Sequence, residues 1–152
     1  MTLDDVRQWY DLSGKTAVVT GGTGALGSEM AVALVGCGAN VAILARKPDL
    51  SDAFKAALDA GPGTYRMIPA DVLKRDVLET AVAEIVAQYG RIDILINGAG
   101  GNHPQATSTA DNPFFDLPEE ALSFVFDLNL LGTICRVKLS ARSWRSKGRG
   151  SF

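Results

Sequence analysis

A glycine-rich segment at residues 20–27 has the residue types and spacing to bind a phosphate group through its backbone. The segment consists of Thr20, Gly21, Gly22, Thr23, Gly24, Ala25, Leu26 and Gly27. Gly22, Gly24 and Gly27 have the spacing G-x-G-x-x-G, which lets a backbone turn approach a pyrophosphate while the following helix N-terminus supplies free N–H groups and partial positive charge. The segment lies between a predicted strand and a predicted helix, so we expect a dinucleotide-binding turn; a plain glycine-rich corner is the alternative.

The residues after the second apolar run bear on which dinucleotide would fit. An acidic residue there binds the ribose 2′-hydroxyl of NAD, whereas a nearby arginine accommodates the 2′-phosphate of NADP. Residues 41–45 are followed by Arg46 and Lys47, with no carboxylate. The sequence therefore favours NADP over NAD, with Arg46 as the phosphate-binding residue. A solvated Arg-Lys pair in a surface loop is the alternative.

Four apolar runs alternate with helical patterns along the chain. The strands are expected at residues 16–20, 41–45, 65–70 and 92–96, and the helices at 26–37, 51–60 and 74–89. Apolar strands separated by helices predict βαβ units with right-handed crossovers, and hence an α/β fold with a Rossmann-type, doubly wound parallel sheet. A long polar loop at 101–118 then precedes a last helix, in which Leu122, Val125 and Phe126 are expected to face inward.

Asn129 lies three and four residues after Phe126 and Val125, so the helical spacing also turns its amide inward. A buried structural amide is the alternative to a functional one.

Three motifs in order resemble the short-chain dehydrogenase/reductase family. They are the 20–27 turn, Asp71-Val72 after the third strand, and Asn97-Gly98-Ala99-Gly100 after the fourth. The resemblance runs from about Leu12 to Thr133 and implies an NAD(P)-dependent oxidoreductase, of which about four strands, the N-terminal half of the fold, are present. The sequence departs from the family pattern T-G-x-x-x-G-x-G at Ala25, where a glycine is usual.

The resemblance also implies roles for individual residues. Thr20 to Gly27 would bind the cofactor phosphates, Asp71 and Val72 the adenine ring, and Asn97, Ala99 and Gly100 would form the wall beside the cofactor. Asn129 matches the helix asparagine that organises the family's catalytic proton relay.

The loop from Gly98 to Thr107 is similar to the branch that contains D-mannonate oxidoreductase and fructuronate-reductase-like enzymes. This similarity implies a small-molecule substrate, a sugar acid with a ketone or secondary alcohol. It also implies a homo-oligomer for the full-length family member. His103 is expected to shape the loop or to contact substrate.

The family's Ser, Tyr and Lys are not found in this chain. The family needs a lysine four residues after its tyrosine, because a phenol requires a nearby cation before its pKa falls toward neutrality. Tyr10, Tyr65 and Tyr89 are followed at that spacing by Gly14, Pro69 and Asp93. We therefore expect a cofactor-binding half that is inactive alone. A non-catalytic dinucleotide-binding module is the alternative. A methyltransferase is disfavoured by the missing carboxylate after the second strand and by the Asn97–Gly100 motif.

Charge divides the chain near its end. Residues 1–135 carry a net charge of −8, and residues 136–152 carry +6 with no acid. We expect an NAD(P)-binding half-domain at 1–133 and a basic tail at 134–152 that does not resemble the family. A shift of reading frame after Ile134 is one hypothesis for this tail, and a nucleic-acid-binding tail is the weaker alternative.

The composition bears on which cellular compartment and which partners we expect. No apolar run approaches the roughly 20 residues of a membrane helix, and the acidic N-terminus differs from a signal peptide. Two cysteines indicate neither a disulfide framework nor a metal site. We expect a cytoplasmic protein with no membrane, metal or nucleic-acid partner.

Overall fold

Four parallel strands form the centre of the computed structural model, which describes residues 1–47 and 49–145, with side chains up to residue 138. The strands are β1 (Thr16–Thr20), β2 (Asn40–Ala45), β3 (Thr64–Pro69) and β4 (Ile94–Asn97). Their order is β3-β2-β1-β4. The chain thus moves outward from β1 to β3 and then returns to the other side of β1. This arrangement confirms the predicted Rossmann-type α/β fold and its N-terminal half.

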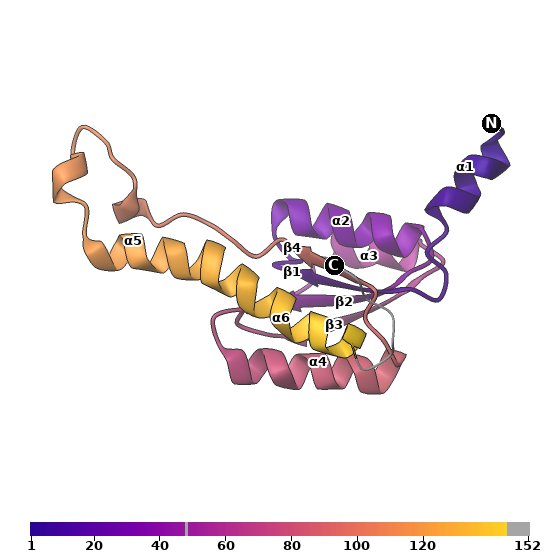
Figure 1. Ribbon diagram of the computed structural model, residues 1–152. Helices are drawn as coiled ribbons and strands as arrows, with labels where there is room; N and C mark the ends of the chain where they lie inside the picture. Colours follow the sequence, from indigo (N-terminus) through magenta and orange to yellow (C-terminus); the bar gives the residue numbers. More distant parts are fainter. Residues whose placement is uncertain (48, 146–152) are drawn as a thin grey trace.

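Helices cover both faces of the sheet. Helices α2 (Ala25–Gly36) and α3 (Asp52–Asp59) lie on one face, and α4 (Arg75–Tyr89) and α6 (Gly132–Arg145) lie on the other (Figure 1). Alternate residues of β1 point into the two resulting cores, with Val19 facing Val35 and Leu58, and Val18 facing the α4 side. All five residues of β1 are buried, which explains why its sequence is an unbroken apolar and β-branched run.

Two parts of the chain project from this body. Helix α1 (Leu3–Tyr10) begins with a capping box between Thr2 and Asp5 and has no buried residue. It was not expected from the sequence, although the Thr2–Asp5 capping box and the spacing of Leu3, Val6 and Tyr10 are helical signals. On the other side, α5 (Glu119–Phe126), the π-helical η3 (Asp127–Leu131) and α6 form one continuous rod (Figure 1).

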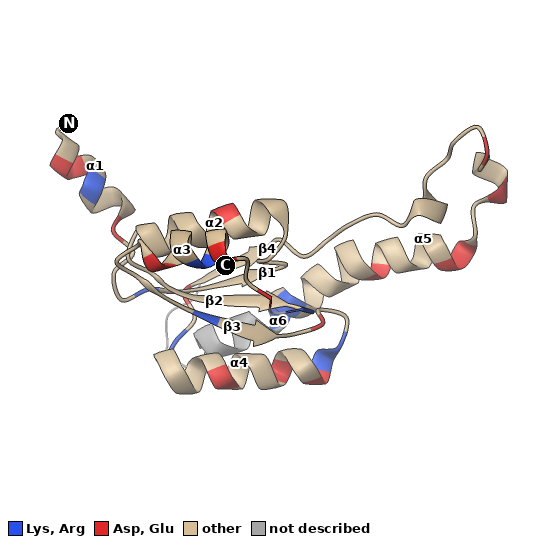
Figure 2. Ribbon diagram, turned by 180° about the vertical axis from the view of Figure 1, so that it is seen from behind, with Lys and Arg blue, Asp and Glu red and all other residues tan. Residues whose placement is uncertain are grey.

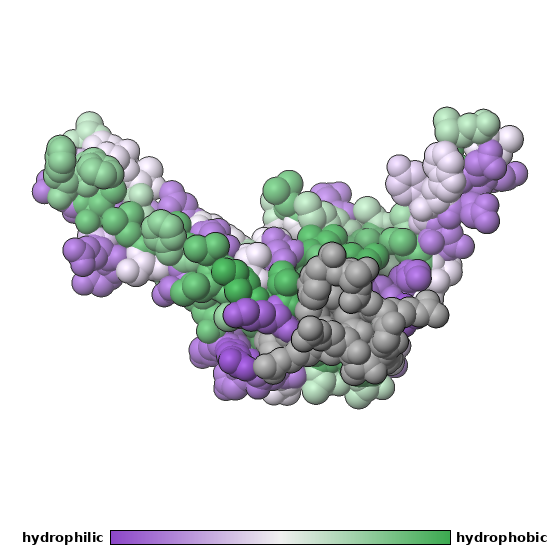
Figure 3. Space-filling model, viewed as in Figure 1, coloured by the Kyte–Doolittle hydropathy of each residue, from purple (hydrophilic) through white to green (hydrophobic). Residues whose placement is uncertain are grey.

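The long loop before the rod contains two short 3-10 turns, η1 (Pro104–Ala106) and η2 (Phe114–Asp116). Figure 3 shows hydrophobic residues following the rod toward the body, and the ribbon of Figure 2 marks acidic positions along α4 and α5. Among the described residues, no helix is both long enough and apolar enough to cross a membrane.

The structure corrects one expectation about the rod. Phe126 does not face inward: 63% of its surface is exposed, whereas Leu122 and Val125 are half-buried. The reason is that α5 packs against the η1 turn and not against the sheet, so its helical face has no core to enter. The predicted boundary between 133 and 134 falls inside the rod, near the start of α6, and residues 146–152 of the predicted tail lie outside the described residues.

Candidate dinucleotide-binding site

The glycine-rich turn joins β1 to α2 and is held tightly against its neighbours. Gly21 has a left-handed backbone (φ 65°), and a Cβ atom there would lie 2.8 Å from the Cα of Ala99. A Cβ atom on Gly22 would lie 2.5 Å from Cγ2 of Ile43, and the Gly22 N–H donates to the Leu44 carbonyl oxygen (3.2 Å). The turn therefore packs closely against the backbone of the segment after β4 and against Ile43 of β2, which larger residues would prevent.

Helix α2 begins directly after this turn with its N-terminus unoccupied by any side-chain cap. Its N-cap residue is Gly24, which offers no oxygen to the N–H groups of the first turn. A Cβ atom on Gly27 would overlap the Gly21 carbonyl oxygen, so the helix lies close against the turn. Thr23, Ala25 and Leu26 are exposed. The free N–H groups and the positive end of the helix dipole fit a phosphate group.

Thr20 joins β1 to the segment that follows β4. Its side chain is 1% exposed, and its hydroxyl accepts the Ala99 N–H (3.2 Å) and donates to the Ile96 carbonyl (3.4 Å). In this structure Thr20 positions the turn against β4, and its contact with a cofactor stays a prediction.

The residues predicted to bind the adenosine end follow β2 and β3 at the same edge of the sheet as the turn. Arg46 is exposed, Val72 is buried, and Asp71 accepts the Leu73 N–H (3.0 Å) in a local turn. The Ala70 N–H donates to the Ala45 carbonyl (2.9 Å), so the two loops start side by side. Parallel strands place the turn, Arg46 and Asp71 at the same edge of the sheet, where the carboxyl ends of the strands lie.

Asn129 binds the loop after β4 with both ends of its amide. Its Nδ2 donates to the Gly101 carbonyl (2.7 Å) and to the Val125 carbonyl (2.8 Å), while Oδ1 accepts the Gly101 N–H (3.1 Å). A Cβ atom on Gly100 would lie 2.7 Å from that Oδ1. The structure thus brings Asn129 together with the predicted wall at Gly100. The residue is exposed overall, which counts against the alternative of a buried structural amide, and its amide turns toward the body, as the helical spacing predicts.

Arg136, on α6, lies at the same wall and was not predicted from the sequence. Its side chain is 2% exposed; Nε donates to Oδ1 of Asn97 (2.8 Å), and Nη2 donates to the Ala99 carbonyl (3.2 Å) and to Oγ1 of Thr133 (2.7 Å). Burial lowers the pKa of this guanidinium. Arg136 stands seven residues after Asn129, on the same helical face, and this spacing is the signal that could have found it.

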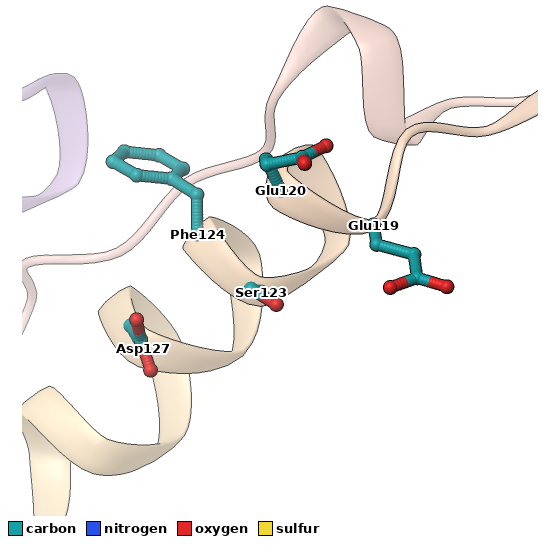
Figure 4. Close-up of a pocket in the computed structure, with 5 residues that line it drawn as sticks. All are labelled: Glu119, Glu120, Ser123, Phe124 and Asp127. Atoms are coloured by element: carbon teal, nitrogen blue, oxygen red, sulfur yellow. The ribbon is translucent and has the colours of Figure 1, made fainter.

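His103 and a nearby surface depression lie away from this edge of the sheet. His103 packs edge-on against Phe124 (ring centroids 5.6 Å apart), and its Nδ1 accepts the Gln105 N–H (3.3 Å), so the residue shapes its loop. The depression is open and lies along α5 (Figure 4). Its lining contains none of the predicted site residues and consists of Glu119, Glu120, Ser123, Phe124 and Asp127. Within the described residues, no group of three or more His, Cys, Asp or Glu side chains is arranged to hold a metal ion.

Sequence comparisons identify relatives of the same class. A family model described as short chain dehydrogenase matches residues 15–152. An uncharacterized oxidoreductase, UxuB of Bacillus subtilis, is 43% identical over 130 residues, which cover 80% of this chain and 47% of the relative. An NAD-dependent glycerol dehydrogenase of Listeria innocua is 31% identical over 152 residues, covering 100% of this chain and 56% of that protein.

Solved structures give the same result. A Haemophilus influenzae protein with bound NAD, proposed to be a D-mannonate oxidoreductase, has a TM-score of 0.80 and 29% identity, over 90% of this chain and 52% of its own. An NADPH-dependent 3-quinuclidinone reductase of Rhodotorula rubra has a TM-score of 0.80 and 26% identity, and the match covers 97% of this chain and 53% of the reductase. The chain spans about half the length of the curated relatives it matches. The resemblance drawn from the three sequence motifs is confirmed, and the chain belongs to the short-chain dehydrogenase family of oxidoreductases.

Proposed function

We propose that this chain forms the dinucleotide-binding half of an oxidoreductase that acts on a sugar acid. The observation that carries the proposal is the turn at 20–27. It leads from a central parallel strand into a helix whose N-terminus has no side-chain cap, at the carboxyl end of β1 and beside its neighbour β4. That position is where α/β sheets of this type bind nucleotides.

Different residues at this edge of the sheet would contact different parts of the cofactor. The N–H groups of the first turn of α2 would hold the pyrophosphate. Asp71 and Val72 would contact the adenine ring, while Asn97, Ala99 and Gly100 would form the wall of the nicotinamide half. When bound, the nicotinamide supplies or accepts a hydride. We assign the substrate, a sugar-acid ketone or alcohol, from the 98–107 loop and from the similarity to the Haemophilus influenzae protein.

The cofactor we favour is NADP(H). The residues after β2 are Arg46 and Lys47, both exposed and with no neighbouring carboxylate in the sequence, so Arg46 can pair with a 2′-phosphate. Similar solved structures include an NAD-bound protein and an NADPH-dependent enzyme. The preference for NADP(H) over NAD(H) is therefore argued from Arg46 and Lys47 of this chain.

Catalysis needs more groups than this chain carries. Asn129 would order the proton relay through its contacts with Gly101. None of the chain's tyrosines is followed by lysine at the required spacing, so the 152 residues are proposed to bind cofactor without turnover. The intact enzyme is proposed to be a homo-oligomer.

Calorimetric titration of the chain with NADPH and NADH tests the proposal. NADPH should bind more tightly than NADH, and Arg46→Gln should remove the difference. The matched control is Arg75→Gln, an exposed arginine at the start of α4. Absence of binding by both nucleotides would contradict the proposed site, and equal affinity for both would contradict the NADP preference.

A non-catalytic dinucleotide-binding module is the second candidate, and the missing Tyr-x-x-x-Lys pair favours it. The two candidates differ in what happens when catalytic groups are supplied. Fusing residues 1–133 to the C-terminal half of the Bacillus subtilis relative should restore sugar-acid reduction if the chain is half an enzyme. A fusion that folds and binds NADPH without turnover would favour the module.

A further inference from the structure

The buried guanidinium of Arg136 has no negatively charged partner among the described residues. Its three hydrogen bonds all go to neutral oxygens, on Asn97, Ala99 and Thr133. Its Nη1 is buried and has no hydrogen-bond partner. In the described part of the chain, every ion pair is formed by other residues. The charge of Arg136 is therefore not compensated locally.

This charge is permanent and weakly screened. Burial lowers the pKa of Arg136, yet an arginine guanidinium stays protonated in proteins because its ordinary pKa lies far above neutral pH. Water and salt ions do not reach a side chain that is 2% exposed, so its electric field extends further into the protein than that of a surface cation.

The position of the cofactor relative to Arg136 is taken from the proposed function. In that proposal, the α2 N-terminus, Arg46 and Asp71 hold the phosphates and adenosine on the β2 and β3 side of β1. The nicotinamide half must then extend to the other side, toward β4. Asn97 ends β4 and Ala99 lies two residues beyond it, and Arg136 hydrogen-bonds to both.

We propose that Arg136 makes the site discriminate between the two redox states of the nicotinamide, in favour of the reduced form. The oxidised ring carries a positive charge and the reduced ring is neutral, while the rest of the molecule is the same. A fixed cation at this wall repels only the oxidised ring. Arg136 is thus a specificity-determining residue for the redox state, and its bias favours the reductase direction.

The test measures the dissociation constants of NADPH, NADP⁺ and 2′,5′-ADP, a probe that lacks the nicotinamide. In the wild-type chain, NADPH should bind about tenfold more tightly than NADP⁺, because a weakly screened cation repels only the oxidised ring. Arg136→Lys keeps the charge below the pKa of the new lysine, which burial lowers, and should keep the ratio in that pH range. Arg136→Gln keeps hydrogen-bonding capacity without the charge and should bring the ratio close to one. Affinity for 2′,5′-ADP should stay the same in all three.

Thr133→Val is a further control, because it removes one hydrogen bond to Arg136 but leaves the charge. Its ratio should match that of the wild type. Equal wild-type affinities for NADPH and NADP⁺ would overturn the proposal even if Arg136→Gln fails to fold. An equal loss of affinity for both forms in Arg136→Gln would show a purely structural role and would also overturn it. If none of the three ligands binds, the proposed dinucleotide site is itself contradicted. If 2′,5′-ADP binds but NADPH and NADP⁺ bind equally well, only this inference is overturned.

Discussion

The glycines of the turn differ in what an added side chain would meet. Side chains at Gly21, Gly22 and Gly27 would collide with the protein itself, at Ala99, Ile43 and the Gly21 carbonyl. At Gly24 the nearest atom to an added Cβ is the Gly21 oxygen, 3.2 Å away. Most of the G-x-G-x-x-G pattern is therefore a packing requirement of the turn, and this is why it is specific when it stands between a strand and a helix.

Substitution Gly27→Ala should destabilise the chain by about 1–3 kcal/mol, since the added methyl group forces the helix away from the turn. Thermal denaturation followed by circular dichroism measures the change. The control is Gly36→Ala in the same helix, where an added Cβ meets no atom within 4 Å and helix propensity predicts a small gain. Equal melting temperatures for Gly27→Ala and the wild type would show that the turn is looser than described.

The sequence predicts the turn well and Arg136 poorly, for physical reasons. The turn is contiguous, so its spacing is visible along the chain. Arg136 binds Asn97, which is 39 residues away, and it begins the segment 136–152, which carries six cations and no acid, a pattern typical of a solvated tail. Its burial depends on neutral oxygens of another element, which no local pattern reveals.

At the level of elements, Asp93 links the starts of β1 and β4. Its Oδ2 accepts the Thr16 N–H (2.9 Å), and its Oδ1 accepts Nε of Arg91 (2.7 Å). Burial acts to raise the pKa of the Asp93 carboxyl, but the hydrogen bonds from Arg91 and Thr16 outweigh it and hold the pKa below its ordinary value. The carboxylate therefore stabilises the pairing that places the turn beside the β4 loop.

Stability should consequently fall in acid. A carboxyl whose pKa is lower in the folded than in the unfolded chain stabilises the fold above its unfolded pKa of about 3.9, and this contribution is lost as pH falls through the lower, folded value. Urea denaturation between pH 7 and pH 3 measures the effect. Asp93→Asn should remove roughly 1–2 kcal/mol at pH 7 and flatten the acid dependence. An unchanged pH profile in Asp93→Asn would contradict the role of this carboxylate.

The side-chain hydrogen bonds between η3 and the loop after β4 come from Asn129. Asn129→Ala removes both hydrogen bonds to Gly101. At about 1 kcal/mol for each bond, opening of the 101–118 loop should rise roughly tenfold or more. Limited proteolysis with mass spectrometry would detect faster cleavage there. Leu130→Ala, at a neighbouring exposed position, is the control; cleavage at the same rate in both variants would contradict the contact.

The bounds of the most buried strands were predicted most accurately from the sequence. The expected span of β1 matches the structure residue for residue, and that of β2 differs by one, because both are apolar on both faces. The π-helical turn at Asp127–Leu131 was not expected, since apolar spacing cannot distinguish it from an α-helix. Asn129 was nevertheless found through its position in the family motif.

The two edges of the sheet differ when the whole molecule is considered. Strand β3 has exposed Thr64 and Arg66 and ends at exposed Pro69, features that protect an edge. Strand β4 is apolar on both faces, and Ile94, Leu95 and Ile96 are half-buried, which is typical of an interior strand. In the described chain β4 pairs only with β1. Its free edge is therefore expected to associate with other polypeptide.

We expect the isolated 152-residue chain to self-associate or precipitate. Besides the β4 edge, Leu130 and Leu131 on the rod are each 52% exposed, and contiguous apolar surface of this kind drives association. Size-exclusion chromatography with light scattering measures the mass. Leu130→Ser with Leu131→Ser should raise the monomer fraction. A soluble wild-type monomer that melts cooperatively would contradict this expectation.

The central claim is that backbone amides at the start of α2 bind the pyrophosphate of a nicotinamide dinucleotide. The most direct measurement is an NMR titration of the ¹⁵N-labelled chain with NADPH, in conditions where the chain stays monomeric. Saturable shifts of the amide signals of residues 22–27, with smaller shifts at Arg46 and Asp71, are the predicted result. Signals from residues 22–27 that do not move, at NADPH concentrations that saturate other family members, would contradict the account.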